Sequence, residues 1–137
     1  MIGAMDDVQI SVVSGNGLTP AARAEILTFC CRAYGEDLAA LFETFTGTTH
    51  VIGRYCRELA SHACWVTRWL QPEGMAALRT AYVELVATAP EFRCRGYASR
   101  VMGRLAQEIA DFDIGGLSPS RSSFYERLGW ELWQGPL

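Results

Sequence analysis

Three arginines surround a glycine in the stretch "RCRGYASR" (93–100), where an apolar run gives way to a helical one. A strand predicted to end at Thr88 leads through the loop "APEFRCRG" into a helix that starts near Gly96. The first N–H groups of a helix lack internal partners and lie at the positive end of its dipole, so they can bind phosphate. Charge-assisted hydrogen bonds from the arginines would add to this attraction. A solvated turn is the alternative, because the stretch is neither a Walker sequence nor a GxGxxG fingerprint.

The elements that must position this loop can be predicted from hydrophobic periodicity and turn residues. Thr19 and Pro20 predict the N-terminus of a helix that Gly35 ends. The remaining pattern predicts strands at 8–14, 50–56, 62–70, 79–88, 112–118 and 130–133, and helices at 36–45, 97–111 and 121–129. The polar "RELAS" (57–61) would connect the second and third strands, and three successive strands would form an antiparallel meander. We therefore expect an α/β (α+β) fold: a mixed, mostly antiparallel sheet flanked by helices, with the strand 79–88 at its centre.

Composition limits the classes of function. A chain of 137 residues, half of them hydrophobic, predicts a single folded domain over 1–137. The net charge of −3 gives no reason to expect nucleic acid as a partner, and weakly favours a cationic small substrate. No export signal is recognised and no apolar run approaches the roughly 20 residues that cross a bilayer, so we expect a cytoplasmic protein without membrane contact.

Cysteine and histidine are expected to be structural. The five cysteines include no CxxC pair, which predicts reduced core cysteines and no metal site. His50 and His62 fall within predicted strands and have no Ser or Cys partner pattern, which favours packed histidines over catalytic bases.

The segment "VELVATAPEFRCRGYASRVM" resembles the acetyl-coenzyme A site of the GCN5-related N-acetyltransferases (GNAT). The family pattern is Gln or Arg, two residues, Gly, one residue, then Gly or Ala. Arg93, Gly96 and Ala98 match it after the expected strand and at the start of the expected helix. Further blocks, "HACWV", "LRTAYVELVA", "GGLSPS", "FYERLGW" and "WQGPL", resemble the aminoglycoside 2'-N-acetyltransferases in the same order.

The resemblance implies transfer of an acetyl group from acetyl-CoA to a primary amine, with no metal. Glu84, a polar residue on the central strand, would be the base; alternation predicts that it faces the same way as Tyr82, Val86 and Thr88. Tyr125, ahead of "GW", would protonate the departing thiolate. The alternatives are an ordinary strand carboxylate and a core tyrosine.

The resemblance also implies two sets of binding residues. The cofactor set is Val86, Thr88, Arg93, Arg95, Gly96, Tyr97, Ala98 and Ser99. The substrate set is Asp37, Glu36, Tyr82 and Ser118. Ser118 could equally be an ordinary serine at a strand end, and Glu36 and Asp37 ordinary solvated carboxylates. A second acid expected a few residues after Asp37 is missing, since Leu41 and Phe42 stand there.

The chain ends where members of the family continue through a further strand. We therefore expect a truncated acceptor side and a homodimer in which a second subunit covers the open sheet edge near 130–133. The alternative function is a non-catalytic or weakly active relative that binds coenzyme A or an aminoglycoside.

Overall fold

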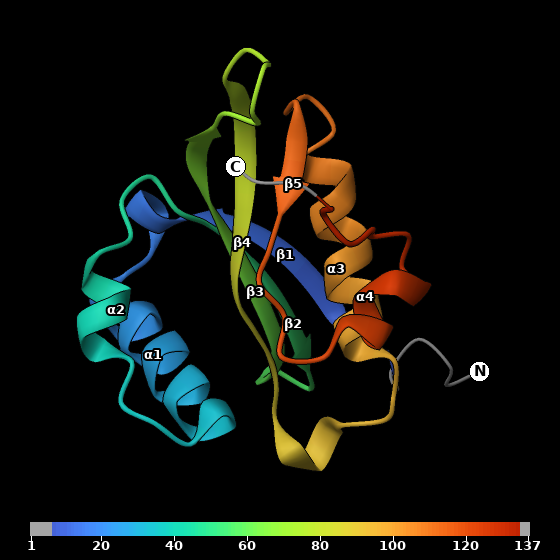
Figure 1. Ribbon diagram of the computed structural model, residues 1–137. Coiled ribbons are helices and arrows are strands. Elements are labelled where there is room, and N and C mark those ends of the chain that lie inside the picture. Colours follow the sequence, from blue (N-terminus) through green and yellow to red (C-terminus); the bar gives the residue numbers. More distant parts are fainter. Residues whose placement is uncertain (1–6, 135–137) are drawn as a thin grey trace.

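Five strands form one sheet and follow each other in chain order (Figure 1). The computed structural model describes residues 7–134. The strands are β1 (Gln9–Ser14), β2 (Thr49–Tyr55), β3 (Glu58–Leu70), β4 (Leu78–Thr88) and β5 (Ile114–Gly116). Neighbouring strands pair antiparallel from β1 to β4, and β5 pairs parallel to β4. This mixed, mostly antiparallel sheet confirms the predicted fold class. The prediction that the strand 79–88 lies at the centre is wrong, because β3 is the middle strand and only β5 lies beyond β4.

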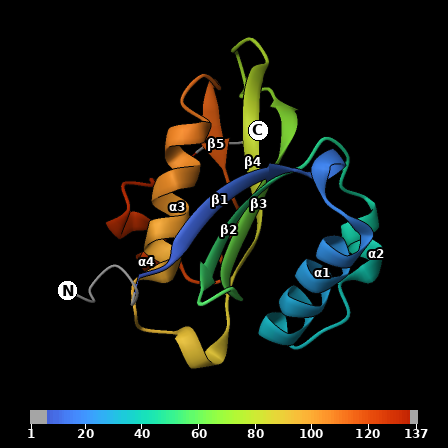
Figure 2. The ribbon, with the colours of Figure 1, turned by 180° about the vertical axis from the view of Figure 1, so that it is seen from behind.

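Helices cover both faces of the sheet (Figures 1 and 2). They are α1 (Pro20–Tyr34), α2 (Ala39–Glu43), α3 (Tyr97–Glu108) and α4 (Ser122–Arg127). Ile26 and Cys30 of α1 are buried in one apolar cluster, and Val101 and Leu105 of α3 are buried in another against the opposite face. We call these the α1 face and the α3 face. Among the described residues no helix has the length and apolarity to cross a bilayer.

The first helix begins and ends at the predicted residues. Thr19 is the N-cap, and its hydroxyl accepts a hydrogen bond of 3.1 Å from the backbone N–H of Ala22. Gly35 ends the helix with a left-handed φ of 71°, a conformation that glycine adopts without steric cost. Pro20 occupies the first turn. These signals are local, so the sequence alone located them.

Several predicted boundaries were wrong. The polar "RELAS" is not a connecting loop: β2 and β3 are joined at Cys56 and Arg57, both left-handed, and the other polar residues lie in β3. The predicted helix 36–45 is shortened to Ala39–Glu43, and the predicted helix 97–111 ends at Glu108.

The predicted strand 130–133 is also wrong, since all its residues are described and form no strand. Trp130 instead packs over β5, where a Cβ added to Gly115 would lie 3.0 Å from its ring. The predicted contact between subunits was to use the edge of a strand at 130–133, and the described residues form no strand there.

A β-bulge interrupts β4 beside its pairing with β3. Cys64 pairs with Glu84 and His62 pairs with Ala87, so β4 carries an extra residue. Leu85 within the bulge is left-handed, with φ of 53°. In a regular strand, residues two positions apart face the same side of the sheet. Here Val83 packs on the α3 face whereas Leu85 packs on the α1 face, so the bulge changes the side that the following residues face.

Candidate functional site

The predicted phosphate loop forms an open helix N-terminus. After β4 the chain passes through the short turn η3 (Pro90–Phe92), and Cys94 and Gly96 then adopt left-handed φ values of 64° and 78°. No described side chain caps the N-terminus of α3, and a Cβ on Gly96 would meet no described atom within 4 Å. The backbone at 96–99 is thus free to approach an anion.

Two neighbouring cavities lie against this helix start. The larger, about 730 Å³, we call the loop cavity; it is lined by Phe92, Arg93, Cys94 and the residues 96–99 of the predicted phosphate loop, and by α4 and Leu128. The smaller, about 350 Å³, we call the strand-end cavity; it lies between the last residues of β4, the end of α1 and α4. Thr88, Arg93, Ala98 and Phe124 line both, so the two are parts of one groove.

The arginines of the loop do not act alike. Arg93 lines both cavities, and its Nε donates to the carbonyl oxygen of Thr88 at 3.4 Å. The guanidinium of Arg95 instead lies over the ring of Phe92, 5.4 Å from its centroid, and Arg100 forms an ion pair with Asp7. Neither Arg95 nor Arg100 is among the described residues that line the two cavities.

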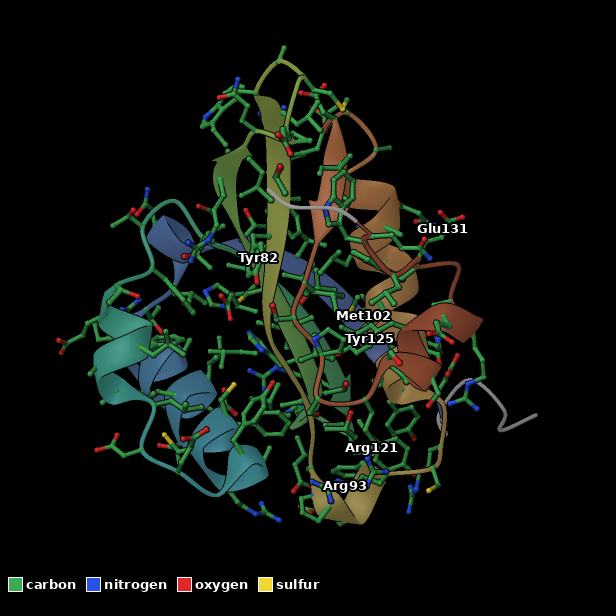
Figure 3. All side chains as sticks on the ribbon, in the orientation of Figure 1. Tyr82, Arg93, Met102, Arg121, Tyr125 and Glu131 are labelled. Carbon is green, nitrogen blue, oxygen red and sulfur yellow. The ribbon has the colours of Figure 1, made fainter. Side chains whose placement is uncertain are left out.

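The sequence reasoning missed Arg121, which supplies a second cation to the strand-end cavity. Figure 3 shows Arg93 and Arg121 at the same end of the groove, with Tyr125 beyond them. Arg121 lies 28 positions after Arg93, just ahead of α4, and nothing local in "PSRSS" distinguished it from a solvated arginine.

Tyr34 is a second residue that the sequence reasoning missed. It is the last residue of α1 and lines the strand-end cavity. Its hydroxyl donates a hydrogen bond of 2.8 Å to the carbonyl oxygen of Val86. Tyr34 is partly buried, with 45% of its surface exposed, and this burial and then the nearby phenol of Tyr125 raise its pKa, so the hydroxyl remains a donor at neutral pH.

Tyr125 stands between two cavities. It lines the strand-end cavity and also a third cavity of about 500 Å³, which we call the side cavity. The side cavity lies between β5, Tyr82 in the middle of β4 and the segment 130–133. Burial raises the pKa of Tyr125, so its hydroxyl holds a proton that it can donate.

Glu84 occupies the α1 face beside the bulge. It pairs with Cys64, which places its side chain on the α1 face, and it lines none of the three cavities described above. The pKa of Glu84 is raised above its usual value, because partial burial outweighs the opposite effect of the Arg68 guanidinium 3.8 Å away. The bulge places Val86 on the opposite face, so the predicted common orientation of Glu84, Val86 and Thr88 is wrong.

The predicted substrate residues divide into two groups. The hydroxyls of Tyr82 and Ser118 lie 2.9 Å apart, and both residues line the side cavity. Asp37 instead accepts a hydrogen bond of 2.9 Å from the N–H of Ala39 at the start of α2, and Glu36 is exposed beside it. Neither carboxylate lines the three cavities.

The two histidines are buried together in the core beneath the bulge. His50 Nδ1 and His62 Nε2 lie 2.9 Å apart, and both residues are almost wholly inaccessible to solvent. Together with Cys64 they form the group of side chains that could hold a metal ion among the described residues.

Comparison with known proteins gives one family. The family model described as "Acetyltransferase (GNAT) domain" matches residues 23–133, most of the chain. An aminoglycoside 2'-N-acetyltransferase of Mycolicibacterium fortuitum is 34% identical over 105 residues, which are 74% of this chain and 53% of that protein. The chain thus spans about half the length of this curated relative.

Solved structures share the fold at low sequence identity. A probable N-acyltransferase from Enterococcus faecalis superposes with a TM-score of 0.75 at 20% identity, over 90% of this chain and 32% of that one. A predicted acetyltransferase from Clostridium acetobutylicum, solved with acetyl-CoA, gives a TM-score of 0.71 at 13% identity, over 94% of each chain. Both structures therefore show that the fold is shared, and nothing more.

Proposed function

This chain belongs to the GNAT acetyltransferase family, and we propose that it transfers the acetyl group of acetyl-CoA to a primary amine. The observation that carries the proposal is the groove between the uncapped N-terminus of α3 and the end of β4, where β4 no longer pairs with β5. A pyrophosphate fits the first feature and an extended, amide-containing arm fits the second. The family membership and the aminoglycoside 2'-N-acetyltransferase relative support the same reaction.

The donor would lie along the groove. The N–H groups at 97–99 and the guanidiniums of Arg93 and Arg121 would hold the pyrophosphate. Beyond Tyr82 the edge of β4 has no pairing with β5, which leaves the backbone at Val86 and Thr88 available to the pantetheine amides. Bound there, acetyl-CoA would supply an activated thioester near Tyr125.

The reaction needs a nucleophile, a base and an acid. The neutral amine attacks the thioester carbonyl, a C–N bond forms, the C–S bond breaks, and the thiolate leaves with the electron pair. Glu84 would take the proton from the amine, acting through water, and its raised pKa makes the carboxylate a stronger base than a free Glu. Tyr125 would then protonate the thiolate.

The proton transfer from Tyr125 has a modest energetic cost. With ordinary pKa values near 10 for tyrosine and 8.5 for a thiol, the transfer is uphill by about 2 kcal/mol. Burial raises the pKa of Tyr125 and adds to this cost. The thiolate would leave into the same partly buried groove, where desolvation raises its own pKa and offsets part of the difference.

The acceptor is proposed to be a small cationic amine, with an aminoglycoside as the first candidate. The name of the curated relative supports this choice. So does acidic character: the chain carries a net charge of −3, and Glu126 and Glu131 line the side cavity beside Tyr82 and Ser118. Asp37 and Glu36 are retained as proposed contacts to further amines of a polycationic substrate.

A thiol-release assay tests this proposal. The wild-type protein is mixed with acetyl-CoA and either an aminoglycoside that bears a 2'-amine or a matched one with a 2'-hydroxyl. Release of CoA only with the 2'-amine compound supports both the reaction and the acceptor. Release with other amines alone would support acetyl transfer and contradict the aminoglycoside. Tight CoA binding without turnover of any amine would favour the non-catalytic binding protein.

A further inference from the structure

Five consecutive carbonyl groups of β4, at positions 84–88, each accept a hydrogen bond from a side chain. The donors are Cys64 Sγ, His62 Nδ1, Tyr34 Oη, Ser61 Oγ and Arg93 Nε, in that order. This segment follows the last residue that pairs with β5 and contains the shift in register against β3. Where the regular ladder is interrupted, side chains therefore satisfy the backbone.

The contact of His62 differs from the other four, because it reaches the strained residue of the bulge. His62 Nδ1 lies 2.9 Å from the carbonyl oxygen of Leu85. Leu85 is left-handed with φ of 53°, a conformation that costs free energy for a residue with a Cβ and that surrounding contacts must offset. The imidazole is the buried group placed to hold this carbonyl.

The hydrogen-bond chain fixes the protons on both imidazoles. A carbonyl oxygen can only accept, so Nδ1 of His62 carries the hydrogen that faces Leu85. Burial keeps the ring neutral, which leaves Nε2 of His62 as an acceptor. His50 Nδ1, 2.9 Å from that atom, must then be the donor. His50 thus orients His62, and His62 orients Leu85.

The bulge also decides where the proposed catalytic groups point. It leaves Glu84 on the α1 face while Val86 packs on the α3 face and lines the strand-end cavity. We propose that His62, oriented by His50, is a positioning residue that holds the bulge and thereby sets the directions of Glu84 and the Val86 backbone for acetyl transfer. The effect on acetyl transfer rests on the proposed function. The role of His62 in holding the bulge rests on the fold alone.

A metal centre is the competing interpretation of the same side chains. His50, His62 and Cys64 have possible ligand atoms within 4.8 Å of one another. A metal would need a lone pair on each histidine, but the donor from His50 already occupies the lone pair on His62 Nε2, and the hydrogen on Nδ1 serves Leu85. The hydrogen-bond chain accounts for every nitrogen of His62.

Two substitutions separate the contacts of His62. In His62→Asn the amide nitrogen is bonded to Cγ, as Nδ1 is in histidine, so the variant keeps a donor toward Leu85 and loses the contact with His50. In His62→Gln the amide lies one bond farther out and can reach His50, but the donor toward Leu85 is lost. Both variants remove a buried ring, so they serve as controls for each other in stability.

The first readout is amide hydrogen exchange at residues 85–88, which does not depend on activity. The proposal predicts exchange in His62→Gln at least about tenfold faster than in His62→Asn, after correction for global stability. It also predicts a kcat about tenfold or more below wild type in His62→Gln and within about threefold in His62→Asn, with the amine KM little changed in both. Equal exchange and equal kcat in the two variants would overturn the proposal.

Two further measurements keep the test decisive. If neither His62 variant folds, the same comparison is made with His50→Asn, which keeps a donor at the Nδ1 position, and His50→Leu, which does not. Stoichiometric zinc in the purified wild-type protein would overturn the hydrogen-bond chain. If wild type turns over no amine, the proposed function fails while the exchange measurement still decides whether His62 holds the bulge.

Discussion

The hydroxyl of Tyr34 donates a 2.8 Å hydrogen bond to the carbonyl oxygen of Val86, which ties the end of α1 to the free end of β4. Both residues line the strand-end cavity, so this bond fixes the distance between two of its walls. A carbonyl oxygen has two lone pairs, and Val86 can still accept a donor from a ligand in the cavity. The contact joins residues 52 positions apart in the sequence.

Replacing Tyr34 with Phe should weaken coenzyme binding. The lost hydrogen bond contributes about 1 kcal/mol, and its loss frees α1 to move away from the cavity. We expect the Kd of CoA, measured by calorimetry, to rise about threefold to tenfold, with a small decrease in Tm. An unchanged Kd would show that this wall of the cavity does not contact the ligand.

Replacing either groove arginine with Ala should weaken CoA binding more strongly. Arg93→Ala and Arg121→Ala each remove a cation from the strand-end cavity, and a charge-assisted hydrogen bond is worth about 1.5–3 kcal/mol. We expect the Kd to rise about tenfold or more in each. Arg104→Ala is the matched control, because this exposed arginine pairs with Glu108 on α3 and lies outside the groove. A similar loss in the control would indicate a general charge effect.

Replacing Tyr125 with Phe should lower turnover and spare coenzyme binding. The variant keeps the ring that packs against Phe124 and Trp130 and removes the proposed proton donor. A general acid contributes about a hundredfold or more, so kcat should fall by this order while the Kd of CoA stays within about threefold. If steady-state kinetics show an unchanged kcat, another group protonates the thiolate.

The buried histidines should make the fold sensitive to acid. Burial lowers the pKa of His50 to about 4, assisted by the charge of Arg23, and lowers the pKa of His62 to about 3. Both values lie below the unfolded value near 6.5, so the unfolded state binds more protons and stability is lost as the pH falls below 6.5. Each histidine removes up to about 1.4 kcal/mol of unfolding free energy per pH unit.

Urea unfolding between pH 7.5 and 5.5 measures this loss, within a range where most carboxylates remain ionised. His50→Asn should show a shallower decrease than wild type, because one of the two titrating groups is gone. A wild-type free energy of unfolding that is flat over this range would contradict the neutral, buried pair.

The fold could be predicted from the sequence where its signals are local. Thr19, Pro20 and Gly35 define α1 through caps that depend only on neighbouring residues. The turn at Cys56 and Arg57 could not be predicted, because two non-glycine residues adopt left-handed backbone there. The segment 130–133 has the apolar composition of a strand, but Trp130 packs against β5 instead.

The site could be predicted only in part for a related reason. The predicted phosphate loop is continuous in sequence, so its strand, turn and helix can be recognised together. Tyr34 and Arg121 reach the strand-end cavity only through the fold. The bulge at Leu85 depends on His62 from the neighbouring strand, so strict alternation placed Glu84 and Val86 on one face although they lie on two.

The proposed acetyl transfer can be tested most directly by following the acetyl group itself. Acetyl-CoA labelled in its acetyl carbons is incubated with wild-type protein and an amine panel, and the products are analysed by mass spectrometry. We expect a labelled acetyl group on an amine nitrogen. Its rate of formation should rise with pH as Glu84 loses its proton, and should be about a hundredfold lower in Glu84→Gln. CoA binding with no label on any amine would show that the chain is not an acetyltransferase of these amines.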